Sequence, residues 1–427
     1  MRGVCAFSSA KAAASLPSAS ISGVRVARGV AAKSARLQPG QQQRCSSSWR
    51  RDEPAPPFAF AFDIDGVLLH VAKPTPGATE TLRFLNESNI PFILLTNGGG
   101  KREVDRVKDL SEKLGVPLTI DNFVQSHTPF KQLVDGPASL RNKTILVTGS
   151  DYEKCRAIAK SYGFQNVVTP ADILAAHPSV FPFRPITDIL ATAQPLPRPL
   201  FNTTSTTPLE ETLRIDAMFV FDDPRDWAAD VQLITDLLLS RSGYLGTYSA
   251  LNGNESLPSC GWQQDGQPPL YFSNGDLLWS ATYHLPRFGQ GAFQAAIAGV
   301  WHRVTGGHEL QRRVIGKPQA ETYEYAERVL GVHRHDILKS KGFREPGTLK
   351  AVYMVGDNPE SDIAGANGHS SENGTQWTSV LVKTGVWSKE RGGEKALQGR
   401  LKPKVIVADV KEAVKWALVQ EGWKGTY

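Results

Sequence analysis

The stretch 58-FAFAFDIDGV-67 joins five apolar residues to two aspartates, Asp63 and Asp65, with one residue between them. A short run without polar residues is typical of a strand that is buried on both faces, as in a parallel sheet. Ligands bind at the carboxyl ends of such strands, where a buried carboxylate needs a ligand or a metal to offset its charge. The alternative is an Asx turn that only ends the strand, with Asp65 in the loop after it.

The segments that follow alternate between helix and strand. We expect a helix over Gly77–Asn86, a strand over Pro91–Thr96, and a helix over Lys101–Leu114 with Val104, Val107, Leu110 and Leu114 at helical spacing. This order is the signature of a parallel α/β sheet.

The same pattern returns late in the chain. A stripe of Phe293, Ile297, Val300 and Val304 predicts a helix over Gly291–Thr305. It is followed by the predicted strand Arg313–Ile315, helix Ala320–Leu330, strands Lys350–Val355, Ser379–Thr384 and Lys404–Ala408, and helix Lys411–Gln420. We therefore expect one α/β domain whose two halves are separated in the sequence.

The middle of the chain has an alternation of its own. Its predicted elements are the strands Thr144–Val147, Ala217–Phe221 and Pro269–Phe272 and the helices Tyr152–Tyr162 and Trp227–Leu239. We predict a second α/β domain over residues 142–288, inserted between the first half of the core, residues 57–141, and the second half, residues 289–427. Within it, the Pro- and Thr-rich stretch Gln194–Pro208 is predicted to be a mobile loop.

A Gly-rich loop follows the second predicted strand, in the sequence Thr96-Asn97-Gly98-Gly99-Gly100. A hydroxyl, an amide and backbone N–H groups just before a helix form a site for an anion. The alternative is an ordinary glycine loop in which Asn97 caps the helix.

Two further motifs lie at strand ends in the second half. In Gly316-Lys317-Pro318, the lysine between two turn residues places a cation at a strand end, although a solvated turn lysine is the commoner outcome for such a tripeptide.

In 354-MVGDNPESDI-363, Asp357 ends an apolar strand and Asp362 follows five residues later. Carboxylate oxygens are the ligands that Mg²⁺ prefers, whereas Asp362 alone could be a helix N-terminal charge.

Charge and composition exclude several classes of protein. The net charge of +6 comes from the N-terminus, because residues 1–51 contain nine of the 48 Lys and Arg and no Asp or Glu, which leaves 39 basic and 42 acidic residues after them. A mildly acidic body without a basic patch or recognition motif argues against nucleic acid as a partner.

No apolar run approaches the roughly 20 residues of a transmembrane helix. Cys5, Cys45, Cys155 and Cys260 form no zinc or disulfide pattern, which suits a reducing compartment.

The first fifty residues are rich in Arg, Ser and Ala and free of acidic residues, as mitochondrial transit peptides are. We therefore predict that residues 1–50 are a mitochondrial transit peptide or a disordered tail outside the fold. If residues 1–50 are a transit peptide, the protein is located in mitochondria, most simply in the matrix.

Taken together, the motifs at Asp63, Thr96, Lys317 and Asp357 resemble those of the haloacid dehalogenase superfamily, in the same order and each at a predicted strand end. The resemblance runs from about Pro57 to the C-terminus. It implies a Rossmann-like core, and the insertion implies a cap domain of the C2 (type IIA) kind. Within that branch, stretches such as 162-YGFQNVVTPADI-173 look closest to the eukaryotic mitochondrial subgroup that includes the cat eye syndrome critical region 5 protein.

The resemblance also implies roles for single residues. Asp63 would attack phosphorus and form an aspartyl-phosphate, and Asp65 would act as general acid and then general base. Lys317 would offset negative charge, and Thr96, Asn97 and Gly98 would bind the phosphoryl group. Mg²⁺ would be held by Asp63, the backbone carbonyl of Asp65, and Asp357, with Asp362 orienting its coordination shell directly or through water.

The second aspartate favours phosphoryl transfer over dehalogenation, because an alkoxide leaving group needs a proton and a halide does not. The predicted activity is a Mg²⁺-dependent phosphatase acting on a small phosphorylated metabolite. A catalytically weak or silent scaffold or regulatory protein on the same fold is the alternative. Two questions stay open. One is whether the chain self-associates through the cap. The other is whether the loop Ser273-Asn-Gly-Asp276 faces the site or forms a plain turn.

Overall fold

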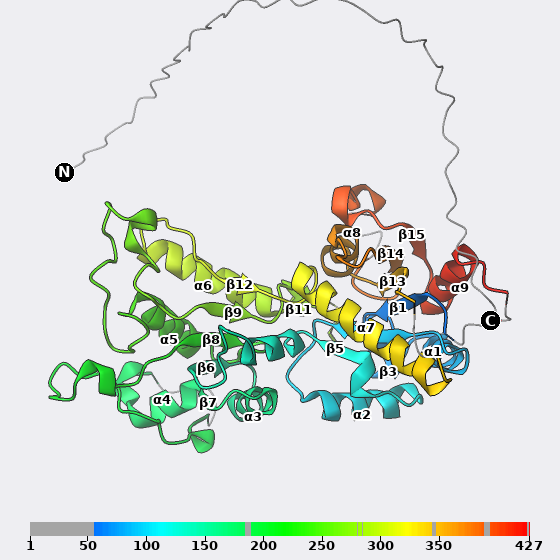
Figure 1. The fold of residues 1–427 in the computed structure, drawn as a ribbon. Coiled ribbons are helices and arrows are strands. Elements are labelled where there is room, and N and C mark those ends of the chain that lie inside the picture. The colour runs from blue at the N-terminus through cyan, green and yellow to red at the C-terminus, as the bar shows by residue number, and fades with distance from the viewer. Residues whose placement is uncertain are drawn as a thin grey trace, which may run out of the picture. The chain divides into compact units, whose positions relative to one another are not determined.

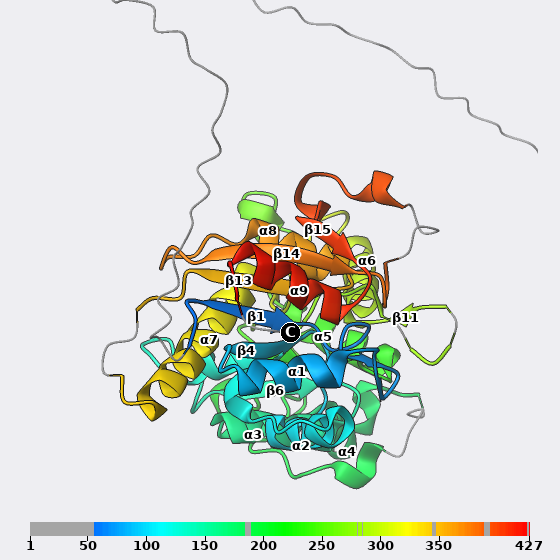
Figure 2. The ribbon, with the colours of Figure 1, turned by 90° about the vertical axis from the view of Figure 1, so that its right-hand side faces the viewer.

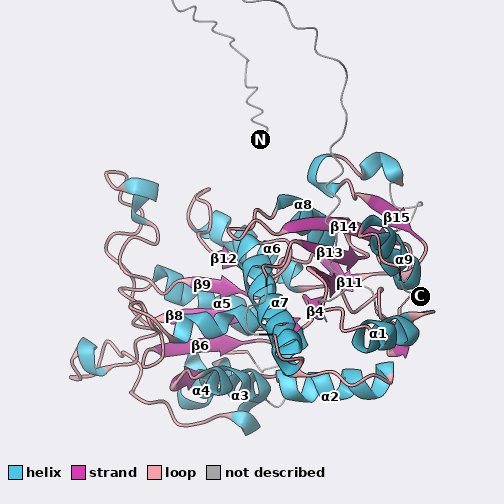
Figure 3. Ribbon diagram, turned by 45° about the vertical axis from the view of Figure 1, so that its right-hand side comes forward, coloured by secondary structure: helices cyan, strands magenta, loops and turns pink. Residues whose placement is uncertain are grey.

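The computed structural model describes residues 55–183, 189–279, 281–283, 285–343, 347–387, 393–424 and 427. The predicted transit peptide, residues 1–50, lies outside the described residues. The described chain forms two parallel sheets, each covered by helices (Figures 1 and 3), which confirms the predicted α/β class.

The first sheet contains the strand that opens the sequence argument. Its six strands are parallel throughout, with β1 in the interior of the sheet. Their order is β15 (Val405–Val407), β14 (Gln376–Val382), β13 (Ala351–Gly356), β1 (Phe58–Phe62), β4 (Phe92–Thr96) and β5 (Phe123–Gln125). All five residues of β1 are buried because helices cover both of its faces.

The two faces of this core sheet differ in residue size. Successive side chains of a strand point to opposite faces, so Phe58, Phe60 and Phe62 pack with the helices α1 (Ala78–Glu87), α2 (Glu103–Leu114) and α9 (Val410–Gln420). Ala59 and Ala61 pack on the other face with α7 (Ala320–Ser340) and α8 (Ala364–Gly368). Figure 2 looks onto α1 and α9 with the strands behind them.

The second sheet belongs to the inserted region and is also parallel. Its order is β12 (Arg313–Val314), β9 (Leu270–Phe272), β8 (Ala217–Val220), β6 (Thr144–Thr148) and β7 (Asn166–Val168). One face packs on α3 (Tyr152–Tyr162), and the other packs on α4 (Pro170–Ala176), α5 (Trp227–Leu239) and α6 (Gln290–Val304). Two short antiparallel ribbons pair β2 (Leu69–His70) with β3 (Lys73–Pro74) and β10 (Leu278–Trp279) with β11 (Arg287–Phe288).

The helix α6 and the strand β12 lie with the second sheet and not with the core. Residues 289–427 were predicted to form the second half of the core, but β12 pairs with β9, and α6 buries Phe293 and Ile297 against the cap strands. The sheets therefore divide the chain after Val314 instead of after Phe288. Periodicity predicts that a helix exists, but it carries no information on which of two similar sheets the helix covers.

Two predicted apolar stripes are partly wrong. In α6, Val300 and Val304 are 40% and 47% exposed while Trp301 is fully buried. In α2, Val104 is 64% exposed and Glu103 takes the buried place beside it. The short elements β5, β7 and α4 were not predicted, and α7 is ten residues longer than expected. Among the described residues, no helix is long and apolar enough to cross a membrane.

Candidate active site

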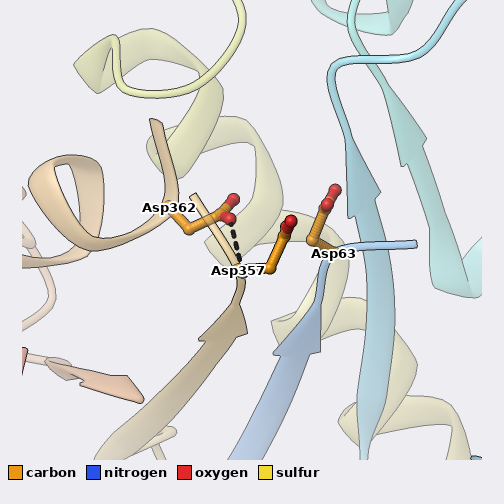
Figure 4. A group of neighbouring side chains, drawn as sticks. All are labelled: Asp63, Asp357 and Asp362. Atoms are coloured by element: carbon orange, nitrogen blue, oxygen red, sulfur yellow. Dashed lines mark hydrogen bonds between the residues drawn. The ribbon is translucent and has the colours of Figure 1, made fainter. Parts of the chain in front are cut away.

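Strand pairing brings Asp63 and Asp357 together. Phe62 of β1 lies beside Val355 of β13, and the N–H of Asp63 donates to the Val355 carbonyl at 2.9 Å, so both aspartates leave the same edge of the sheet. Figure 4 shows them facing one another, with Asp362 at their side. One carboxylate oxygen from each of the three lies within 4.8 Å of the others. The expectation that Asp63 and Asp357 are close enough to share a metal ion is therefore confirmed.

Lys317 lies between two of these carboxylates. Its Nζ donates to Asp63 Oδ1 at 2.7 Å and to Asp362 Oδ1 at 2.6 Å, and the lysine is only 2% exposed. Burial alone would lower its pKa, but the carboxylates of Asp362 and Asp63 raise the pKa of Lys317 well above its usual value. The lysine is thus a fixed cation and not the solvated turn residue of the alternative reading.

Negative charge exceeds positive charge at this point. Burial first, and then the neighbouring carboxylates Asp63 and Asp362, raise the pKa of Asp357 well above its usual value. Burial likewise raises the pKa of Asp63, although Lys317 opposes the shift. Three buried carboxylates with one lysine lack a countercharge, and an all-oxygen donor set is what Mg²⁺ prefers. The residues present therefore fit the predicted metal.

Asp362 is held differently from the other two aspartates. Its Oδ2 accepts from the backbone N–H groups of Asp357 and Asn358 at 3.1 and 3.0 Å, and its Oδ1 accepts from Lys317. With both oxygens engaged, Asp362 fixes the loop and the lysine. This arrangement suits an orienting role better than that of a direct metal ligand.

Two glycines make this crowding possible. A Cβ atom added at Gly385 would lie 1.9 Å from Asp357 Oδ2, and one added at Gly356 would lie 2.2 Å from the Asp362 Cβ. Any larger residue would displace a carboxylate. Gly385 was not among the predicted site residues, and no local motif distinguishes it from a turn glycine.

Asp65 and Thr96 both line the cavity, but only Asp65 is exposed at its mouth. The Asp65 side chain is 51% exposed and its Oδ2 is 4.0 Å from the guanidinium of Arg106. Thr96 is buried, and its Oγ1 accepts from the N–H of Gly98 at 3.0 Å. The Asp65 carboxylate is therefore accessible to a reactant.

The side chain of Asn97 makes contacts that the sequence pattern did not predict. Its Nδ2 donates to Asp276 Oδ2 and to the Lys317 carbonyl, both at 2.9 Å, and its Oδ1 accepts from the Lys317 N–H at 2.8 Å. The side chain thus holds the lysine loop to the glycine loop, and its amide donates to Asp276 and to the Lys317 carbonyl. Asn97 lines the cavity, and its expected contact with the phosphoryl group stays a prediction.

The sequence did not decide whether the loop Ser273–Asp276 faces the active site, and in the structure it faces the core. In addition to the Asp276 contact, Asn274 Nδ2 donates to the Asn97 carbonyl at 3.2 Å. Desolvation raises the pKa of Asp276 to about 7, although the Asn97 amide and Lys317 lower it. The cap therefore reaches the core site through this loop.

A cavity of about 450 Å³ contains these groups. The predicted site residues on its wall are Asp63, Asp65, Thr96, Asn97, Gly98, Lys317 and Asp357, so the structure brings most of the predicted site residues together. Sequence reasoning missed the other wall residues, among them Lys101 and Arg106 from the core and Ser150, Asp222, Asp223, Arg225, Leu278 and Trp279 from the cap. Only Asp222 and Asp223 carried a signal, since they follow an apolar strand as Asp63 does.

Comparisons with known proteins identify the family of this chain. The model described as haloacid dehalogenase-like hydrolase matches residues 60–165, and a second, HAD-hydrolase-like model matches residues 314–413. A mitochondrial hydrolase of Saccharomyces cerevisiae is 38% identical over 371 residues, which is 84% of this chain and 94% of the relative. The chain belongs to the haloacid dehalogenase-like hydrolase family, as predicted.

A second relative is a fusion protein. The cardiolipin synthase (CMP-forming) / mitochondrial hydrolase fusion protein of Schizosaccharomyces pombe is 38% identical over 369 residues, which is 86% of this chain and 54% of that protein. This chain therefore spans about half of its length.

Solved structures share the fold at low sequence identity. A hypothetical protein of Pyrococcus horikoshii aligns at a TM-score of 0.53 and 19% identity, covering 84% of this chain and 99% of the other. A 4-nitrophenylphosphatase of Thermotoga maritima aligns at 0.50 and 17% identity, covering 84% and 96%.

Proposed function

We propose that this chain is a Mg²⁺-dependent phosphomonoester hydrolase in which Asp63 is the nucleophile. The observation that carries the proposal is the buried group of Asp63, Asp357 and Asp362 around Lys317, at the base of a cavity. A pocket with this many carboxylates accepts a phosphate only when cations balance it. The intact set of motifs disfavours a catalytically silent scaffold.

In the proposed reaction, a carboxylate oxygen of Asp63 attacks phosphorus and the ester P–O bond breaks. Asp65, accessible at the mouth, gives its proton to the leaving alkoxide and then takes one from the water that hydrolyses the aspartyl-phosphate. Lys317 stabilises the charge on Asp63 and on the phosphoryl oxygens. Thr96 Oγ1 and the N–H groups of the loop from Asn97 to Gly98 are the proposed phosphoryl donors.

Asp63, the backbone carbonyl of Asp65, and Asp357 are the proposed Mg²⁺ ligands, with Asp362 orienting the group. The bound ion would supply positive charge to the phosphoryl oxygens. Magnesium should raise the melting temperature of the wild-type chain, because a ligand that binds only the folded state stabilises it. An Asp357→Asn variant should show a much smaller rise. An equal rise in both proteins would exclude Asp357 as a ligand.

The activity is tested by a phosphatase screen of the purified chain with Mg²⁺ against phosphorylated metabolites, using the Asp63→Asn variant as the blank. The proposal predicts turnover that the variant lacks. The screen should include phosphorylated glycerolipids, since the name of the fission yeast relative joins a hydrolase to a cardiolipin synthase. Release of phosphate at the same rate by the variant would refute the proposal.

A mitochondrial location is proposed on two grounds: the acid-free, Arg-rich residues 1–50 and the printed names of both relatives. Import of a fluorescent fusion into mitochondria should be lost when residues 1–50 are removed. A truncated protein that still enters mitochondria would refute the role proposed for this segment.

A further inference from the structure

A short hairpin at the edge of the active-site cavity is unusually apolar. This rim hairpin, residues 277–288, pairs Leu278 with Phe288 and Trp279 with Arg287. Its exposed apolar side chains are Leu277, Leu278, Trp279, Tyr283, Leu285 and Phe288, between 39% and 70% exposed; residues 280 and 284 lie outside the described residues. Six of the 17 exposed large hydrophobic side chains of the described chain thus lie within twelve residues, which marks an interaction site.

The hairpin is a formed element that projects from the ribbon beside β11 (Figure 2). The N–H of Gly289 donates to the Leu277 carbonyl at 3.0 Å, and Trp279 Nε1 donates to the Phe288 carbonyl at 3.2 Å. These bonds fix the base of the hairpin while the apolar side chains remain in solvent. Leu278, Trp279 and Phe288 are therefore exposed on paired strands.

The hairpin is continuous with the catalytic cavity. Leu278 and Trp279 line the same cavity as Asp63 and Lys317. A molecule whose phosphate reaches Asp63 therefore has its remainder beside the apolar hairpin. This continuity indicates a leaving group with a large apolar part.

Cations accompany the apolar side chains. Arg287 lies over the Tyr283 ring at 4.6 Å, and Arg225 lines the cavity together with Lys101 and Arg106, which also contact Asp109 at 3.4 Å. Tryptophan, tyrosine and arginine beside leucine and phenylalanine are the composition of segments that sit at a membrane interface. An anionic phospholipid surface offers acyl chains to the hairpin and phosphate groups to the cations at the same time.

On the premise of the proposed phosphatase function, we infer that the rim hairpin docks on an anionic phospholipid surface and that the substrate is a phosphomonoester lipid within it. The phosphate enters the cavity and the acyl chains stay on the hairpin side. The bond that breaks is the P–O bond to the lipid alkoxide, which leaves with a proton from Asp65, and water is the only co-reactant.

The test uses the full chain and a variant with Leu285→Ser and Phe288→Ser, two residues outside the cavity wall. The matched control carries Phe183→Ser and Val419→Ser, which are 69% and 74% exposed elsewhere in the sequence. Binding is measured by co-sedimentation with vesicles of phosphatidylcholine and phosphatidylglycerol. The hairpin variant should bind about tenfold more weakly or worse, since burying one such side chain is worth roughly that factor, and the control should bind like the wild type.

Turnover is measured with phosphatidic acid in the same vesicles and with glycerol phosphate, its chain-free counterpart, in solution. The hairpin variant should lose turnover of phosphatidic acid in proportion to its binding and keep its rate on para-nitrophenyl phosphate. Unchanged vesicle binding by the hairpin variant would overturn the inference. If that variant also shifted from dimer to monomer, the hairpin would be a subunit contact.

The two proposals fail in different ways. A wild-type chain that hydrolyses para-nitrophenyl phosphate but prefers glycerol phosphate to phosphatidic acid would overturn the lipid inference alone. A chain that hydrolyses none of these esters would overturn the phosphatase proposal, and co-sedimentation would still decide whether the hairpin docks on lipid.

Discussion

Two strand ends in this molecule are nearly the same in sequence and differ in their chemical surroundings. Phe60-Ala-Phe-Asp63 ends β1 in the core, and Phe219-Val-Phe-Asp222 ends β8 in the cap. Both aspartates are buried, 9% and 8% exposed, and both line the cavity. An apolar strand followed by aspartate therefore predicts a buried carboxyl at a sheet edge, but it does not predict what that carboxyl does.

The partners make the difference. Asp63 accepts from the ammonium of Lys317 at 2.7 Å. Asp222 accepts from the backbone N–H of Ser150 at 2.6 Å and bonds the Ser150 hydroxyl, and no lysine or arginine donates to it in the described hydrogen bonds. Burial raises the pKa of Asp222. Burial raises the pKa of Asp63 as well, but there the ammonium of Lys317 opposes the rise and favours the charged carboxylate that the proposed nucleophile needs.

The largest effect should come from exchanging these two aspartates for asparagine. Asp63→Asn should lower turnover by at least about 10⁴-fold, because an amide cannot attack phosphorus. Asp222→Asn should keep kcat on para-nitrophenyl phosphate within about tenfold of the wild type, since its change removes no reacting atom. Steady-state kinetics and acid trapping of the phosphoenzyme would measure both. Equal losses would mean that the two strand ends share the chemistry.

The next effect concerns the proton donor. Asp65→Asn should slow alkyl phosphate turnover by about 10²- to 10⁴-fold. An aryl phosphate, whose leaving group hardly needs a proton, should still form the phosphoenzyme and give a burst of product. The same loss on both esters, without a burst, would remove Asp65 from the role of general acid.

The third effect compares the buried cations of the two sheets. Lys317→Met should destabilise the chain by about 3–5 kcal/mol in EDTA, because it leaves buried carboxylates uncompensated. Arg156→Met is the matched control in the cap, where Arg156 is 3% exposed and bonds both oxygens of Asp172 at 2.8 and 2.9 Å. Both variants should lose stability in chemical denaturation, but only Lys317→Met should also lose turnover. A fully active Lys317→Met protein would contradict the role given to the lysine.

The last effect is a pH dependence in the cap. Burial raises the pKa of Asp230 to about 7, and its Oδ1 accepts from Thr148 Oγ1 at 2.7 Å and from Tyr152 OH at 3.2 Å. The folded state binds this proton more tightly than the unfolded state. Its contribution to stability is therefore complete below pH 3.8 and is lost as the pH rises through about 7.

Asp230→Asn removes this titration, so the variant should gain stability relative to the wild type between pH 4 and 7, by at most about 1.4 kcal/mol per pH unit. Denaturation curves at several pH values would measure the difference. Parallel curves for the two proteins would show that Asp230 does not titrate in this range.

Much of the site could be predicted because its motifs are local. Asp63 and Asp357 each follow an apolar strand of one parallel sheet, and parallel strands end at one edge, so their convergence follows from the sequence pattern. Lys317 follows β12 of the other sheet, so its approach to them does not. The roles of Asp65, Thr96 and Gly98 remain proposals, although Asp65 and Thr96 do lie at the cavity. The contact of Asn97 with Lys317 could not be predicted, because the two residues lie 220 positions apart and no local pattern indicates it.

The assignment of elements to sheets was less predictable. Helix α6 and strand β12 have the same local character as core elements, and only the pairing of β12 with β9 assigns them to the cap. Val104, Val300 and Val304 kept helical spacing but face solvent, because the width of a buried stripe depends on the neighbouring element and not on the helix itself.

The sequence by itself determined the α/β class, the order of the motifs, and the carboxylates and the lysine proposed for catalysis, because these depend on residue types that follow short strands. Only the tertiary structure decided which strand-end aspartates share a cation, how Asn97 joins the lysine loop to Asp276, and that the rim hairpin stands beside the cavity with its apolar side chains in solvent. The physical reason is that charge compensation and exposure depend on atoms that are close in space and distant along the chain.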